Sequence, residues 1–342
     1  MNRADKAVMR LMLGLGLAVL VAYGFALPLP FVVCLMSILV LCKPGPPLPL
    51  AKGVIIAAIF AALVTGGVLM VPLLENFALS GILLTGAILY GVFFLGLISS
   101  NPLTMVLVIS FALIPVAGVA DQSIVGMLSI TLAIGILTGV LVSSASSALF
   151  PDQPANAANR PASDSVSHEA ARWIALRATM IVMPVFVLAL TNPSFYIAAI
   201  MKTVALSQQA GEVDARSAGS ELVGSTLMGA FIAAIVWAGL SLHPNLWMLT
   251  LWMMGAALWA GSAIFGTRAT RFRPSFWSNT LITMLILLGP AIEDSANGSG
   301  VLEASAVRTG LFVAVALYAW GTVWILERWR NSRRVVLPSG HG

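Results

Sequence analysis

Charged side chains are scarce in this sequence. Only 9% of its 342 residues are Asp, Glu, Lys or Arg, whereas 59% are hydrophobic. An ordinary soluble domain contains roughly 25% charged residues. Apolar stretches of about 20 residues recur along the whole chain, and each is long enough to cross the hydrocarbon core as a helix. The composition excludes a soluble globular protein and indicates an integral membrane protein, with the basic and apolar opening segment as an uncleaved first helix.

Cysteine and histidine are also few. Cys34 and Cys42 lie in the second apolar run without the spacing of a metal site, so we expect neither a disulfide framework nor a zinc site. The three histidines, His168, His243 and His341, fall outside the apolar runs. An intramembrane enzyme would need a nucleophile and base, or metal ligands, at membrane depth. We therefore expect no catalytic residue, metal or cofactor.

The apolar runs predict an all-α membrane protein with about twelve transmembrane helices. The expected helices cover residues 8–27, 29–42, 51–72, 77–98, 102–120, 124–150, 171–190, 194–210, 219–241, 244–262, 274–292 and 304–327. If the N-terminus is cytoplasmic, every Lys and Arg except Lys202 and Arg308 falls on the cytoplasmic side, as the positive-inside rule requires. Both termini are then cytoplasmic. Because the basic residues form no single patch, the net charge of +5 does not indicate a nucleic-acid partner.

The chain divides into two halves. Hydrophobicity stops at residues 151–169, which are rich in Pro, Ala, Ser and Asn and read as a cytoplasmic linker. It joins a six-helix block at 1–150 to a second at 170–328, and a basic cytoplasmic tail at 329–342 follows.

The two blocks show the same order of features. Each starts at an arginine entering a long helix, Arg10 or Arg177, turns outside on prolines, and continues with a short apolar run. The fifth helix of each block begins at a proline, Pro102 or Pro274. Six spans restore the original orientation, so the pattern predicts two parallel six-helix repeats.

Lys202 is the one basic residue within a predicted span. It lies seven residues into the eighth helix, about 10 Å deep at 1.5 Å per residue. Its stem would not comfortably reach either surface, and a charge facing lipid would be costly, so it should face the bundle interior or a wet cavity. The second and eighth helices are the shortest apolar runs of their halves, and matched short spans point to a midplane binding site.

We therefore predict that Lys202 binds a substrate carboxylate in a cavity between the halves. Thr203, Ser207 and Gln208 would assist from the same helix, Asn279 from the eleventh and Arg308 from the twelfth. Lys202 could also carry a coupling proton, since no carboxylate lies deep in a predicted span. Three alternatives remain: Lys202 snorkels at the interface, it pairs with an acid such as Glu221, or Arg308 pairs locally with Glu303.

The chain resembles the fusaric acid resistance and aromatic acid exporter family of bacterial inner-membrane proteins, in particular short members without the large cytoplasmic domain. The resemblance rests on the two six-helix blocks and on the stretch DARSAGSELVGSTLMGAFIAA, where Arg216 precedes Gly224, Ser225 and Gly229. This spacing is similar to the family's Arg, Gly-Thr, Gly pattern. The sequence departs from it at Ser225, where threonine is usual, and in the first half, where the stretch beginning at residue 51 has only Lys52 and Gly53.

This resemblance implies proton-driven export of small organic anions, such as aromatic carboxylic acids, across the inner membrane. It also implies a periplasmic adaptor of the membrane-fusion type, and the very short outer loops agree with a need for one. We further expect a homo-oligomer, such as a dimer. Two other function classes stay open: a scaffold subunit of an envelope complex that does not transport, and, with less support, an intramembrane enzyme.

The predicted topology can be tested with reporter fusions. A reporter fused at residue 160 should be active only as a cytoplasmic reporter, because the linker follows six spans and the N-terminus is cytoplasmic. A periplasmic readout at this position would contradict the arrangement.

Overall fold

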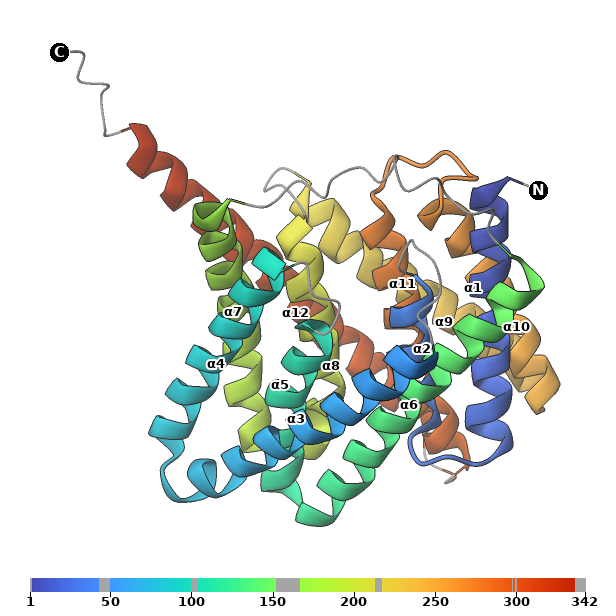
Figure 1. Cartoon of the computed structure of the whole chain (residues 1–342), viewed down its shortest axis with the longest axis horizontal. Coiled ribbons are helices and arrows are strands. Elements are labelled where there is room, and N and C mark those ends of the chain that lie inside the picture. The colour runs from blue at the N-terminus through green and yellow to red at the C-terminus, as the bar shows by residue number, and fades with distance from the viewer. Residues whose placement is uncertain are drawn as a thin grey trace.

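Helices make up nearly all of the structure. The computed structural model describes residues 2–42, 50–99, 104–151, 167–212, 217–296, 298 and 300–335. Within them, twelve α-helices and no strands are found (Figure 1). The helices are α1 (Arg3–Gly24), α2 (Pro30–Leu41), α3 (Leu50–Asn76), α4 (Ala78–Ser99), α5 (Thr104–Ala120), α6 (Gln122–Leu149), α7 (His168–Thr191), α8 (Pro193–Glu212), α9 (Gly224–Leu242), α10 (Leu246–Ile264), α11 (Pro274–Ala296) and α12 (Val301–Val335). A π-helical turn, η2 (Gly219–Val223), leads into α9. The predicted all-α fold is confirmed.

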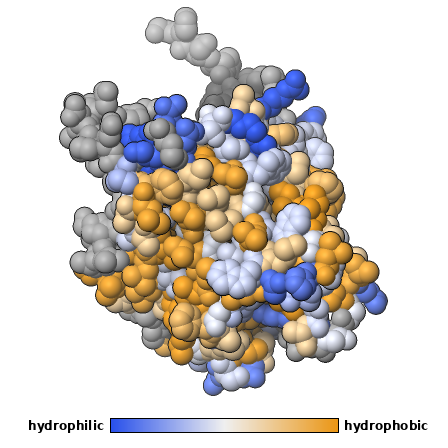
Figure 2. Space-filling view, turned by 90° about the vertical axis from the view of Figure 1, so that its right-hand side faces the viewer, coloured by the Kyte–Doolittle hydropathy of each residue, from blue (hydrophilic) through white to orange (hydrophobic). Residues whose placement is uncertain are grey.

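Eight of the described segments are long and apolar enough to cross a membrane. They are α1, α4, α6, α7, the continuous η2–α9 segment, α10, α11 and α12. Two shorter apolar helices accompany them, α2 and Leu107–Ala120 of α5. Figure 2 shows apolar residues covering the middle of one face, with hydrophilic residues gathered mostly toward its upper end. These features are those of a multi-pass membrane protein.

The interior of the bundle is built around α8 and α11. In the most apolar window of α11, 78% of the residues are buried, against 22% in α4 and 28% in α12, so α11 lies inside and the other two lie at the periphery. Helix α8 packs against α5, α7, α11 and α12 and lies in the middle of the bundle in Figure 1. A side chain on α8 is therefore far more enclosed than one on α4 or α12.

Helix contacts recur between elements six positions apart in the chain. Helix α3 packs on α5 as α9 packs on α11, and α2 packs on α6 as α8 packs on α12. Contacts between the halves also come in such pairs. The contact of α1 with α10 corresponds to that of α7 with α4, and the contact of α5 with α8 corresponds to that of α11 with α2. The starting turns of α1 and the last turns of α12 lie at the same end of the bundle in Figure 1.

Glycines allow two of these pairs to approach closely. A Cβ added to Gly67 of α3 would lie 2.8 Å from the carbonyl oxygen of Ser110 in α5. A Cβ added to Gly229 of α9 would lie 2.8 Å from the carbonyl oxygen of Thr280 in α11. Real Cβ atoms do not come so near, so both contacts depend on glycine.

The boundaries of two helices differ from the prediction. Helix α8 has 20 residues and is not short, although α2, with 12, is. Helix α8 begins at Pro193 and ends at Glu212, two residues beyond the predicted end at residue 210. Helix α12 runs on to Val335, so the first part of the predicted tail is helical, and Arg330 Nη1 lies 4.0 Å from Glu327 Oε1 on this extension. Most of the predicted linker, residues 152–166, lies outside the described residues.

Candidate functional site

Lys202 lies in the centre of the bundle. It is the tenth of the 20 residues of α8, and its exposed fraction is 0%. At 1.5 Å per residue, about 14 Å of helix precedes it and a similar length follows. Such a position is not that of a lysine snorkelling at the membrane surface. The ammonium group must therefore be satisfied by groups within the protein or by a bound molecule.

Two side chains of α11 accept hydrogen bonds from Lys202. Its Nζ donates to Asn279 Oδ1 at 3.2 Å and to Thr283 Oγ1 at 2.6 Å. Asn279 and Thr283 are four residues apart, so they lie on one face of α11. Thr283 Oγ1 donates its own hydrogen to the carbonyl oxygen of Asn279 at 2.6 Å, which leaves its lone pairs for the ammonium. Both acceptor groups, the Asn279 amide and the Thr283 hydroxyl, are uncharged.

A chain of hydrogen bonds continues from Asn279 toward α9 and back to α8. Because an ammonium only donates, Asn279 turns its oxygen to Lys202 and its amide nitrogen outward. Asn279 Nδ2 donates to Ser225 Oγ at 2.7 Å, and Ser225 Oγ lies 3.3 Å from its acceptor Gln209 Oε1. Gln209 Nε2 then donates to the backbone oxygen of Glu221 at 3.1 Å. We call Asn279, Ser225 and Gln209 the polar chain.

Glu221 lies at the far end of the polar chain. It belongs to the π-helical turn η2 and is only 4% exposed. Its Oε1 accepts from the backbone N–H of Arg273 at 3.3 Å, while its buried Oε2 has no hydrogen-bond partner. The alternative in which Lys202 and Glu221 form an ion pair is therefore wrong, since the polar chain separates them.

Lys202 has no carboxylate partner among the residues that the structure describes. An ammonium carries three hydrogens, and only two are used here. Leaving a buried charge without a counter-ion costs several kcal/mol, and neutral acceptors offset only part of that. An anion that reached Lys202 would therefore displace no internal ion pair.

The remaining predicted residues divide into two groups. Thr203 and Ser207 are buried on α8, but their hydroxyls donate to carbonyl oxygens of their own helix, those of Ala199 and Val204. Gln208 is only half-buried, and its neighbour Gln209 joins the polar chain instead. Helical periodicity explains the difference: a residue seven positions after Lys202 returns to the same face, whereas one six positions after it does not.

Arg308 lies outside this network. Its Nη1 is 2.6 Å from Asp294 Oδ2 at the end of α11, and this ion pair replaces the predicted local pair with Glu303. Side chains that the prediction did not include, Gln209 and Thr283, take part in the network instead. Thr283 is found by the same periodic argument, four residues after Asn279.

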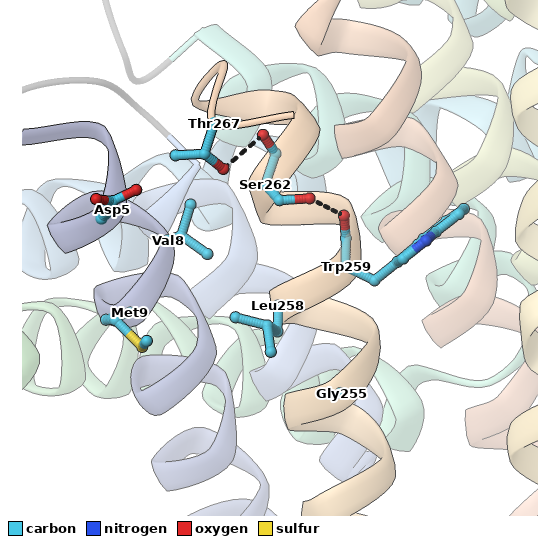
Figure 3. A pocket seen from close by; sticks show the side chains of 8 residues that line it. All are labelled: Asp5, Val8, Met9, Gly255, Leu258, Trp259, Ser262 and Thr267. Atoms are coloured by element: carbon cyan, nitrogen blue, oxygen red, sulfur yellow. Dashed lines mark hydrogen bonds between the residues drawn. The ribbon is translucent and has the colours of Figure 1, made fainter. Parts of the chain in front are cut away.

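A surface groove lies away from Lys202 and the polar chain. It lies between α1 and α10, has a volume of about 530 Å³, and is lined by Asp5, Val8, Met9, Gly255, Leu258, Trp259, Ser262 and Thr267 (Figure 3). Neither Lys202 nor any residue of the polar chain lines it. The hydrogen-bond partners of Lys202 all belong to residues 170–328. The two helices that carry them, α8 and α11, also pack against α5 and α2 of the first half, and Lys202 is fully buried. Ligand access therefore requires helix movement.

Comparisons of the chain with protein-family models, with curated proteins and with solved structures each gave no match. The functional argument therefore rests on the geometry of the site.

Replacing Thr283 by valine should weaken the fold. Valine keeps the shape but removes the closer acceptor of Lys202, so the free energy of unfolding should fall by about 1–3 kcal/mol. Thr226→Val is the matched control, because buried Thr226 bonds only the Leu222 carbonyl of its own helix, at 2.8 Å. Denaturant unfolding in micelles measures both variants, and equal losses would contradict a special role for the Lys202 contact.

Proposed function

We propose that this protein is a transporter that exports small organic anions, and that the anion binds at Lys202. The observation that carries the proposal is a fully buried lysine side chain that has neutral partners and no carboxylate within the described residues. Ionisable residues inside a membrane protein usually belong to a binding or conduction pathway. The unused donor of Lys202 gives a carboxylate a charge-assisted contact that water-filled surroundings would weaken.

The architecture that we propose is twelve transmembrane segments in two parallel six-helix repeats. The paired helix contacts support it, since most contacts within and between the halves have a counterpart six positions along the chain; the contact of α8 with α11 does not. The close approaches at Gly67 and Gly229 are a second correspondence. Rocking of one half against the other would give Lys202 alternate access to the two sides.

Substrate and partners follow from the family resemblance. It favours aromatic carboxylates as cargo, the bacterial inner membrane as location, and a periplasmic adaptor of the membrane-fusion type as partner. Self-association as a dimer is part of the same proposal. We propose no enzymatic activity, and the scaffold alternative differs because it would leave Lys202 without a ligand.

Two substitutions of Lys202 test the transport function. Lys202→Ala should abolish protection of cells against aromatic acids while folded protein remains in the membrane, because the anion loses its only cationic contact at the site. Lys202→Arg should retain part of the protection, since the charge survives with a different shape. Resistance and membrane abundance are measured together.

Lys6→Ala is the matched control, since it removes a lysine at the start of α1 whose Nζ donates to the carbonyl oxygen of Pro151 at 2.8 Å. It should export normally. Normal export by Lys202→Ala would end the proposal.

A further inference from the structure

Glu221 is a buried carboxyl group whose second oxygen has no partner. Oε2 of Glu221 is enclosed at the π-helical turn, and no donor or acceptor among the described residues reaches it. An ionised Oε2 lacks a hydrogen-bond donor, and a protonated one lacks an acceptor. Buried polar atoms of this kind are rare and π-helical turns frequently mark functional sites. A group that gains and loses a proton during function explains this arrangement.

The polar chain joins Glu221 to Lys202 with every donor pointing the same way. Lys202 donates to Asn279, Asn279 to Ser225, Ser225 toward Gln209, and Gln209 to the Glu221 backbone oxygen. Aligned hydrogen bonds polarise one another. The alignment favours positive charge at the Lys202 end and negative charge at the Glu221 end. Ser225 can interrupt this alignment, because the Leu222 carbonyl oxygen is a second acceptor for its hydroxyl at 3.2 Å.

Few charges face Glu221 from the elements around it. Arg273, before α11, donates its backbone N–H to Oε1, and its guanidinium interacts electrostatically with the carboxyl group. Helix α8 contributes the neutral Gln209, and α12 contributes Trp320, which packs against Gly219. The next acid on α12, Glu327, pairs with Arg177 at 3.3 Å. Lys202 is the cation at the other end of the polar chain, which reaches the backbone oxygen of Glu221.

We propose that Glu221 is a proton-binding site whose protonation is linked to anion binding at Lys202. This inference rests on the proposed function, because it needs an anion at Lys202. In the empty state the ammonium of Lys202 and the carboxylate of Glu221 balance one another. When an organic anion joins Lys202, one proton passes from a hydronium ion of the solvent to Glu221 Oε2: an O–H bond of hydronium breaks, an O–H bond forms on Oε2, and neutral water remains. The net charge of the site is then the same before and after.

Charge balance is the physical reason for the linkage. A second negative charge in a poorly solvated interior is costly unless one of the two is neutralised. Protonated Glu221 therefore raises the affinity of Lys202 for the anion, and by reciprocity the bound anion raises the affinity of Glu221 for the proton. The site thus binds the proton of a weak organic acid at Glu221 and its anion at Lys202.

Proton uptake during benzoate binding tests this linkage. Purified protein in weakly buffered detergent solution is titrated with sodium benzoate, which is fully ionised near neutral pH and brings no proton. Wild-type protein should take up about one proton for each benzoate bound, and its affinity should fall about tenfold per pH unit where Glu221 is ionised. Glu221→Gln imitates the protonated side chain. It should bind benzoate with an affinity that does not depend on pH, and without proton uptake.

Two further variants make the result specific. Glu303→Gln alters an exposed acid in the first turn of α12 and should behave as wild type. Ser225→Ala interrupts the polar chain and should bind benzoate with weaker pH dependence. Benzoate binding without proton uptake in wild type, or undiminished uptake in Glu221→Gln, would overturn the linkage alone. Absence of benzoate binding to wild type at every pH would overturn the proposed function, and the linkage with it.

Discussion

The buried ammonium of Lys202 is the constraint on which the interior of the second half depends. An uncompensated charge at the centre of an apolar bundle is costly, so the surrounding helices must bring polar groups to it. Helix α11 does so with Asn279 and Thr283. Those two side chains must in turn be oriented, and Ser225 of α9 orients Asn279 at 2.7 Å. Ser225 can reach Asn279 because α9 and α11 nearly touch one turn further on, at Gly229.

The first half has the same close approach without the polar residues. The carbonyl oxygens of Ser110 and Thr280 face the two glycines, so these residues are taken as equivalent positions. Ile109 is then the first-half equivalent of Asn279, and Leu113 is the equivalent of Thr283. Ile109 and Leu113 are buried and apolar. The packing requirement is therefore shared by the two halves, whereas the polar chain is a feature of the second. Close helix packing alone does not explain why α9 and α11 carry these polar side chains.

Much of this arrangement could be predicted from the sequence. Long apolar runs and the placement of arginines are strong signals, and twelve helices occur where they were expected. The burial of Lys202 also follows from its depth. Other features depend on contacts between distant segments. Arg308 pairs with Asp294 and not with Glu303, because the turn between α11 and α12 brings the end of one helix to the start of the next. No pattern within α12 alone reveals that partner.

The choice of Gln208 over Gln209 had a different cause. Both glutamines are adjacent in sequence, and only the rotation of α8 relative to Lys202 decides which one faces the interior. Helical periodicity contains this information, because Gln209 lies seven positions after Lys202 and both residues fall within the predicted helix 194–210. The actual helix continues to Glu212, so Gln209 remains in register with Lys202.

Direct contact between the lysine and a carboxylate is the central claim, and solid-state NMR can measure it. The protein carries nitrogen-labelled lysine side chains and is saturated with benzoate labelled at its carboxylate carbon. The proposal predicts a dipolar coupling between the carboxylate carbon and a single lysine Nζ, and loss of that coupling in Lys202→Met. A coupling that persists in Lys202→Met, or wild-type protein that binds benzoate without any such coupling, would contradict it.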